Sequence, residues 1–266
     1  MSITLNEHEW AEEMIEQRTL GKKPFETLTR IARYYLDKNY PKSAVRDMLE
    51  SYILQCDPRA SLPKYSKIID TALNKALKYE AISIDYIGVT TAELRRIGDL
   101  EGIQTKRLAF TLLVLSKYWD MINPNSDHWV NNKDSEIMSL ANIDTSIKRQ
   151  SAMYRTLKEL GMIQFSKKID NINVRVCFAE DDDVELYITD MRNLGYQYLK
   201  YCGEPYFECE NCGITVKEDN PGSGRKQKYC KSCAVEIKTK QSVDSVMRDR
   251  TNKNVGKNDM PLSPLV

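Results

Sequence analysis

The residues of this chain best suited to chemistry are two pairs of cysteines. Cys209 and Cys212 stand in CENCG, Cys230 and Cys233 stand in CKSCA, and 17 residues separate the two pairs. Two intervening residues let both thiolates of a pair face one ion, and a gap of about 15–20 residues fits the hairpin that brings the second pair round. Gly213 suits the positive φ that such a turn requires. The pattern predicts one bound Zn²⁺.

We expect this zinc ion to be structural. Four thiolates complete the tetrahedral coordination of zinc and leave no position for a reactive water molecule. The two histidines, His8 and His128, lie far from the cysteines in sequence. The ion would let a segment too small for its own core fold. Free cysteines or redox-active thiols are the alternative, although a thioredoxin-type dithiol needs one pair and not two. Cys202 is interpreted as a packing residue.

The sequence shows no constellation for catalysis. It contains no Walker motif and no dinucleotide fingerprint, and the run PGSGRK at 221–226 lacks the glycine spacing of a phosphate loop. The acidic run 180–183 is interpreted as a solvated boundary loop, with a divalent-metal site as the alternative. We therefore expect a protein that is not an enzyme. A weaker hypothesis is that the protein is an accessory of a primase or initiator, with an active site that includes Asp181 and Asp182.

Charge is distributed unevenly along the 266 residues, of which 41% are hydrophobic and 29% are charged. From Lys217 to Lys257 there are 11 Lys and Arg against 5 Asp and Glu, an excess of +6, so the net charge of +1 leaves −5 for the rest. Such a basic segment suggests a polyanionic partner, although solubility and disorder are alternative reasons for it. The first residues lack the pattern of a signal peptide, and the apolar run Leu108–Leu115 is too short for a membrane span. We expect a location in the bacterial cytoplasm, no contact with membranes and no small-molecule substrate.

The fold class expected from the hydrophobic pattern is mainly α. Residues 1–80 have apolar positions at three- and four-residue steps, which predicts a bundle of about four helices. Basic residues of this bundle, such as Arg30, Arg33 and Arg46, are interpreted as solvated helix faces, with a phosphate-contacting surface as the alternative. Residues 81–102 are expected to form a connector, within which Thr90 or Thr91 resembles a helix N-cap.

Residues 103–180 have the order of elements of a winged helix-turn-helix domain. The strongest helix is predicted at 105–122, apolar nearly all round and hence central. Gly161 is placed to end the last helix of the domain. The remaining predicted elements are a strand near 129–130, a short helix at 135–141, a turn at 142–144, a helix from Asp144 or Thr145 to about Leu160, and strands at 162–166 and 172–178 joined by a hairpin turn at 167–171.

The helix from Asp144 or Thr145 to about Leu160 is the candidate for reading DNA. Met153, Leu157 and Leu160 form its apolar stripe, which turns Lys148, Ser151 and Arg155 to the opposite side. Cationic and hydroxyl groups are what base edges and phosphates require of a recognition helix. Further expected contacts are Arg149 at a flanking phosphate, Lys167 and Lys168 on the wing, and Arg225, Lys226 and Lys228 on the ribbon between the cysteine pairs.

The rest of the chain is expected to contain a connecting helix at 184–204, a small four-cysteine zinc ribbon at 205–237 and a disordered basic tail at 238–266.

Four stretches of sequence carry a resemblance to known proteins: RLAFTLLVLSKYW at 107–119, ELGMIQFSKK at 159–168, NLGYQYLKYCGEPYFECENCG at 193–213 and KYCKSCA at 228–234. The chain resembles uncharacterised winged-helix/zinc-ribbon DNA-binding proteins of Gram-positive prophages and mobile elements. The resemblance implies a phage or mobile-element context and carries no established activity. The N-terminal helices are also loosely similar to the small helical domain that follows primase modules in phage replication proteins.

Two hypotheses about function follow. The first is a nucleic-acid-binding protein, with DNA as its partner, that acts in the replication or transcription control of a phage or mobile element. The second is a protein-interaction module that binds and modulates a host factor such as a polymerase, a helicase or a defence enzyme.

Overall fold

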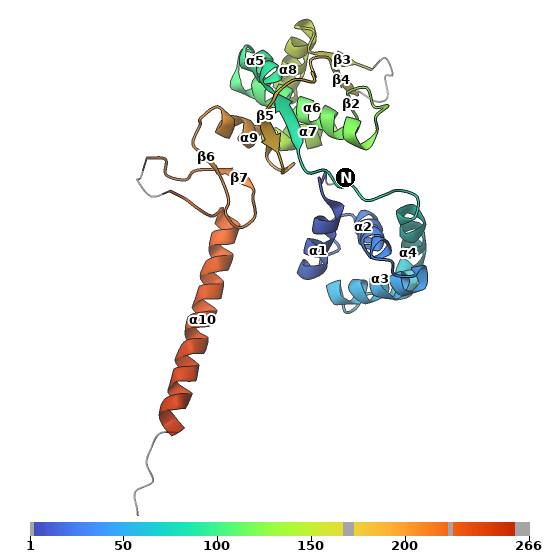
Figure 1. Ribbon diagram of the computed structural model, residues 1–266, viewed down its shortest axis with the longest axis vertical. Helices are drawn as coiled ribbons and strands as arrows, with labels where there is room; N and C mark the ends of the chain where they lie inside the picture. Colours follow the sequence, from blue (N-terminus) through green and yellow to red (C-terminus); the bar gives the residue numbers. More distant parts are fainter. Residues whose placement is uncertain (1–2, 167–172, 223–225, 259–266) are drawn as a thin grey trace, which may run out of the picture. The chain divides into compact units, whose positions relative to one another are not determined.

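The computed structural model describes residues 3–166, 173–222 and 226–258, and the side chains of its last helix as far as Met247. The chain forms two compact units, Met1–Gly195 and Tyr196–Val266, each described by itself (Figure 1). The described residues form ten helices and three small sheets, so the fold is mainly α, as predicted. No helix in this part of the chain is long and apolar enough to span a bilayer.

Four helices form the bundle predicted for residues 1–80. The side chain of Asn6 begins the first helix by accepting hydrogen bonds from the backbone N–H groups of His8 and Glu9, and Pro24 begins the second. Their apolar stripes meet in one core that includes Leu28, Ile53 and Leu73. The helices are α1 (Glu7–Gln17), α2 (Pro24–Asp37), α3 (Lys42–Cys56) and α4 (Leu62–Ala76).

A buried ion cluster joins α1 to α2. The carboxylate of Glu7 contacts the guanidinium groups of Arg30 and Arg33, and the three side chains are only 2%, 3% and 8% exposed, respectively. The Arg30 guanidinium also lies 4.7 Å above the ring of Trp10. Both interpretations of these two arginines from the sequence, solvated faces or phosphate contacts, are therefore wrong. The partner that permits their burial lies more than twenty residues earlier in the chain.

The segment expected to be a simple connector contains a strand and a helix. Strand β1 (Ile87–Thr90) leads into α5 (Thr91–Gly98), and Thr90 and Glu93 form a capping box at the start of that helix. The capping side chain predicted at Thr90 is thus confirmed. Lys117 donates to the Glu93 carboxylate at 2.8 Å, which ties the start of α5 to the long central helix.

Strand β1 pairs antiparallel with β5 (Val184–Ile188). The connecting helix predicted for 184–204 is therefore wrong in its first part, since only α9 (Leu194–Tyr201) is helical there. Ile188 is buried whereas Glu185 and Tyr187 are exposed, and this alternation is the period of a strand. The prediction of a helix at 184–204 did not take this alternation into account.

The helices and strands predicted between 103 and 180 are present in the predicted order, whereas the hairpin turn predicted at 167–171 lies outside the described residues. Helix α6 (Ile103–Ile122) is central, and every residue from Leu108 to Leu115 is buried. The elements after α6 are β2 (Trp129–Val130), α7 (Asp134–Leu140), α8 (Ile147–Glu159), β3 (Ile163–Phe165) and β4 (Val174–Val176). Strands β2, β4 and β3 form, in this order, an antiparallel sheet that lies beside α6 and α8 (Figure 1).

Helix α8 begins and ends at identifiable residues. Its N-cap is Ser146, not Asp144 or Thr145 as predicted, and the Ser146 side chain makes no capping hydrogen bond. Gly161 has φ +69°, which confirms its predicted role in ending the helix.

The second unit contains a two-stranded sheet and a long helix. Strands β6 (Tyr206–Glu208) and β7 (Thr215–Lys217) pair antiparallel, and α10 extends from Lys231 to Asn258. The disorder predicted from 238 onward is therefore wrong as far as Asn258. No proline or glycine interrupts residues 231–255, and Glu236 and Lys240 form an ion pair of 2.9 Å one turn apart, both of which favour a helix.

Candidate metal centre and nucleic-acid interface

The four predicted cysteines lie together in the second unit. The sulfur atoms of Cys209, Cys212, Cys230 and Cys233 all lie within 4.8 Å of one another, and three of the four residues are buried. Cys209 follows β6, whereas Cys230 and Cys233 stand at the start of α10. The hairpin of the sheet therefore supplies one pair and the helix start supplies the other. This cluster can hold a metal ion.

Backbone hydrogen bonds shape the turn of the first pair. The N–H of Cys209 donates to the carbonyl of Ile214 at 3.0 Å, and the N–H of Gly213 donates back to the carbonyl of Cys209 at 2.9 Å. Gly213 has φ +72°, as predicted from its place after the cysteine pair.

Further N–H groups point at the sulfur atoms. The backbone N–H of Cys230 donates to Sγ of Cys209 at 3.3 Å, and the side-chain amide of Asn211 donates to Sγ of Cys233 at 3.3 Å. Burial raises the pKa of the Cys209 thiol, but the N–H donors of Cys230, Cys212 and Asn211 outweigh burial and lower that pKa to about 6. Burial raises the pKa of Cys212 to about 12. At Cys209 the N–H donors therefore favour the thiolate form that a metal requires.

Cys202 does not join this group. It is exposed, so its predicted role as a packing residue is wrong. Within the described ranges the four cysteines are also the single group of three or more side chains placed to bind a metal, and Asp181 and Asp182 lie exposed in the turn before β5.

The structure places the predicted reading face on the exposed side of α8. Lys148, Arg149, Ser151 and Arg155 are all exposed. The helix carries four cations, Lys158 included, against one carboxylate, Glu159. In the part of the chain that the structure describes, no ion pair engages Lys148, Arg149 or Arg155. Among the described residues the charge of these cations is therefore not compensated by a carboxylate.

The opposite side of α8 is held firmly. Met153, Tyr154 and Leu157 are buried, and the Tyr154 hydroxyl donates to the Asp134 carboxylate at 2.6 Å, which joins α8 to the first turn of α7. Leu160, predicted to continue this apolar stripe, is instead 59% exposed. Burial, followed by the hydrogen bond to Asp134, raises the pKa of Tyr154, so its hydroxyl stays protonated and donates. The contact of Tyr154 with Asp134 was not predicted, because the residues around Tyr154 do not indicate which side chain its hydroxyl meets.

A second contact that sequence reasoning missed fixes the turn between α7 and α8. Arg107 of α6 donates from Nε to the carbonyl of Ala141 at 2.9 Å. Gly195 of α9 lies against the same carbonyl, and a Cβ atom there would stand 1.9 Å from its oxygen. Only glycine permits this approach, which nothing in the local sequence announces.

The cations predicted on the wing and the ribbon tip are described in part. Lys167, Lys168 and Arg225 lie outside the described residues. Lys228 forms an ion pair with Glu210 at 3.2 Å, which partly neutralises it. Lys226 is exposed.

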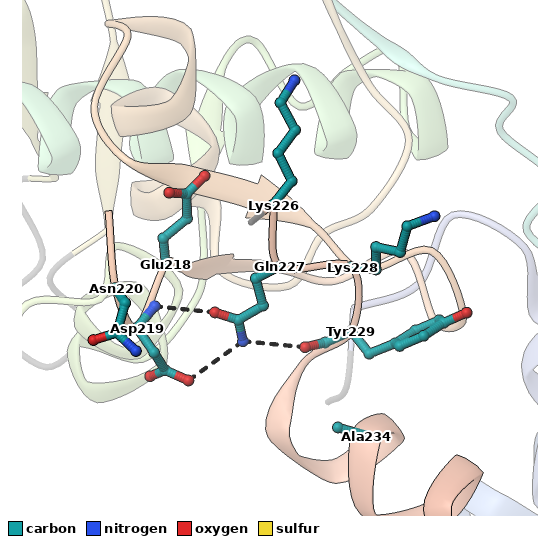
Figure 2. A pocket seen from close by; sticks show the side chains of 8 residues that line it. All are labelled: Glu218, Asp219, Asn220, Lys226, Gln227, Lys228, Tyr229 and Ala234. Atoms are coloured by element: carbon teal, nitrogen blue, oxygen red, sulfur yellow. Dashed lines mark hydrogen bonds between the residues drawn. The ribbon is translucent and has the colours of Figure 1, made fainter. Parts of the chain in front are cut away.

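An open pocket of about 430 Å³ lies between residues 218–220, residues 226–229 and Ala234 of α10 (Figure 2). Gln227 spans it by accepting from the backbone N–H of Asp219 at 3.0 Å and donating to the Asp219 carboxylate and to the Tyr229 carbonyl. Figure 2 shows Lys226 and Lys228 on the side of this segment away from Gln227.

Comparison of the chain with protein-family models, with curated proteins and with solved structures finds no match. Function is therefore inferred from the residues and their geometry.

Proposed function

We propose that residues 103–180 form a winged helix-turn-helix domain that binds duplex DNA through α8. The observation that carries this proposal is the exposed face of α8, on which Lys148 and Arg155 have no carboxylate partner among the described residues. Arg149 lies nearer the buried side of the helix but is exposed as well. Uncompensated cations on one helix face are the electrostatic pattern of a phosphate-binding surface.

The order of elements supports the proposal. Helices α7 and α8 are joined by a short turn, as in a helix-turn-helix, and β3 and β4 form the hairpin that a wing requires after the second helix. Strand β2 pairs on the other edge of β4 and closes the sheet against α6. Lys167 and Lys168 belong to the loop of this hairpin in sequence, where a wing contacts DNA.

We further propose that the four cysteines bind one structural Zn²⁺. Tetrahedral zinc with Zn–S bonds of about 2.3 Å requires sulfur atoms about 3.8 Å apart. The distance from Sγ of Cys212 to Sγ of Cys230 is 3.8 Å, and the other sulfurs lie within 4.8 Å. Four sulfur donors are the set that zinc prefers over magnesium or calcium. When bound, the ion supplies a fixed crosslink between β6 and α10 and no reactive position.

In this proposal the ribbon adds a second, weaker contact to DNA through Lys226 and Arg225. The protein acts without catalysis, in the cytoplasm of a bacterial host, in the replication or transcription control of a phage or mobile element. We take that context from the four sequence stretches at 107–119, 159–168, 193–213 and 228–234 alone.

The test is binding to a fluorescein-labelled 24-base-pair duplex, followed by anisotropy from 25 to 300 mM salt. Lys148→Ala/Arg155→Ala should weaken binding at least tenfold at low salt and should reduce the slope of log K against log salt by about 2, since each lost phosphate contact contributes about 0.9. Lys64→Ala/Lys67→Ala removes the same charge from exposed positions of α4 and is the matched control. Equal effects of the two double variants, or no binding by wild type at the lowest salt, would sink the proposal.

A protein partner is the second candidate function, favoured by α10. Val235, Val243, Val246 and Met247 are each at least 50% exposed on this helix and, at 100° per residue, lie on one side of it, so they form an exposed apolar stripe. A host polymerase, helicase or defence enzyme that copurifies in stoichiometric amount after nuclease treatment, and is lost with Val243→Lys/Val246→Lys, would establish this role.

A further inference from the structure

The first residue of α8, Ile147, has a side chain that no fold requirement explains. It is 80% exposed, the largest value among the exposed large apolar residues of the described chain. Isoleucine is among the residue types most often buried in folded proteins. An exposed position at the start of a helix could be occupied by a polar residue instead. Single exposed apolar side chains are common on protein surfaces, but this one stands in the first turn of the helix proposed to read DNA.

Ile147 belongs to the face that the proposed function assigns to DNA. At 100° per residue, Ile147, Ser151 and Arg155 lie within about 80° of arc, and Lys148 and Ala152 extend the same face. All five are exposed, whereas Met153, Tyr154 and Leu157 are buried. Ile147 stands at the edge of the exposed face, because the buried Tyr154 lies about 20° from it around the helix. The N-terminal residues of a recognition helix are those that reach base edges in the major groove.

We propose that Ile147 contacts the C5-methyl group of thymine, so that α8 prefers duplex in which A·T pairs meet its first turn. This inference rests on the proposed DNA binding. Thymine is the one standard base that presents an apolar group in the major groove, and the other groups there are hydrogen-bond donors and acceptors. Lys148 and Ser151 supply the polar contacts to neighbouring groups.

The charge around Ile147 favours DNA over a protein occupant of this face. Lys148 and Arg149 follow it directly, and α8 has four cations against one carboxylate. A surface that docks a protein through an exposed isoleucine has no need of unpaired cations beside it. A polyanion with an apolar group between its phosphates satisfies both features at once.

Replacing thymine by uracil removes only the methyl group, so it isolates the contact. We would measure binding to 24-base-pair alternating dA·dT and dA·dU duplexes, and to dG·dC duplexes with cytosine or 5-methylcytosine. Wild type should bind dA·dU about fourfold more weakly than dA·dT, the factor equivalent to one buried methyl group. The 5-methyl group should strengthen binding to dG·dC by a similar factor.

Ile147→Ala should abolish both differences and leave the salt dependence unchanged. Leu160→Ala is the matched control, since Leu160 is 59% exposed at the other end of the same helix and lies outside the reading face. It should keep the wild-type preference for the methyl group. Thermal melting of both variants should match wild type, because neither side chain belongs to the core.

The outcomes separate this inference from the function on which it rests. Equal binding of dA·dT and dA·dU by wild type overturns the methyl contact but leaves DNA binding intact. A preference that survives in Ile147→Ala overturns the assignment to this residue. A change from dimer to monomer in Ile147→Ala, measured by sedimentation without an effect on the preference, assigns Ile147 to a second copy and also overturns it. No binding to any of the four duplexes at low salt overturns the proposed function.

Discussion

The ion cluster of Glu7, Arg30 and Arg33 offers a sharp test of the packing in the N-terminal bundle. Glu7→Gln preserves the size of the side chain and removes its charge, which leaves two guanidinium groups buried beside a neutral amide. Their side chains are 3% and 8% exposed, so water can replace the lost carboxylate only if the bundle opens. We expect the free energy of unfolding to fall by about 3–5 kcal/mol, the cost of breaking a buried ion pair from one side.

That loss is a large part of the total stability of a domain, which is of the order of 5–15 kcal/mol. Urea denaturation followed by far-UV circular dichroism measures it as a lower midpoint with an unchanged slope. Glu16→Gln makes the same substitution at an exposed site on α1 and should leave the midpoint unchanged.

A triple variant distinguishes the cost of leaving a buried charge without a partner from the cost of altered packing. Glu7→Met/Arg30→Met/Arg33→Met removes every charge of the cluster and should be more stable than Glu7→Gln, because no ion then remains without water or partner. If Glu7→Gln unfolds at the same urea concentration as Glu16→Gln, the cluster is solvated in solution and the reasoning from its burial is refuted.

Two further predictions concern the metal centre and the turn before α8. Chelation should release one equivalent of zinc and expose four additional thiols to a thiol reagent, since the four cysteines are the proposed ligands. A truncated chain that ends at Gly195 should keep its helical circular dichroism, because residues 1–195 form a compact unit without these cysteines. Release of no metal, or no change in the number of reactive thiols, would contradict the zinc site. Gly195→Ala should lower the free energy of unfolding by about 1–3 kcal/mol, because its Cβ would overlap the Ala141 carbonyl and displace the bond from Arg107. Gly98→Ala, with open space around its Cβ, is the control, and equal melting temperatures for the two variants would rule the close contact out.

The features that could be predicted from sequence are those specified by neighbouring residues. A Cys-x-x-Cys pair, the capping box of Thr90 and Glu93 and the helix stop at Gly161 each need only four or five consecutive residues. The four cysteines were predicted as one cluster because the gap between their pairs is itself a known hairpin length. The order of elements from α6 to β4 followed from changes of period along the chain.

The features that could not be predicted depend on residues far apart in sequence. Strand β5 was interpreted as helix because its partner β1 lies almost a hundred residues earlier, and pairing decides its conformation. Arg30 and Arg33 were placed on the surface because nothing near them reveals Glu7. The need for glycine at 195 is likewise visible only once Ala141 lies beside it.

Strands β1 and β5 also determine how the middle of the chain is attached. They are antiparallel neighbours, and the N–H of Thr91 donates to the carbonyl of Asp183 at 3.3 Å, so the point where the chain enters this region and the point where it leaves lie side by side. Residues 91–183 therefore begin and end at one place, on a pair of strands that also packs against α5 and α6. One strand pair thus holds both ends of the part proposed to read DNA, so a change in the register of β1 against β5 would move both ends together.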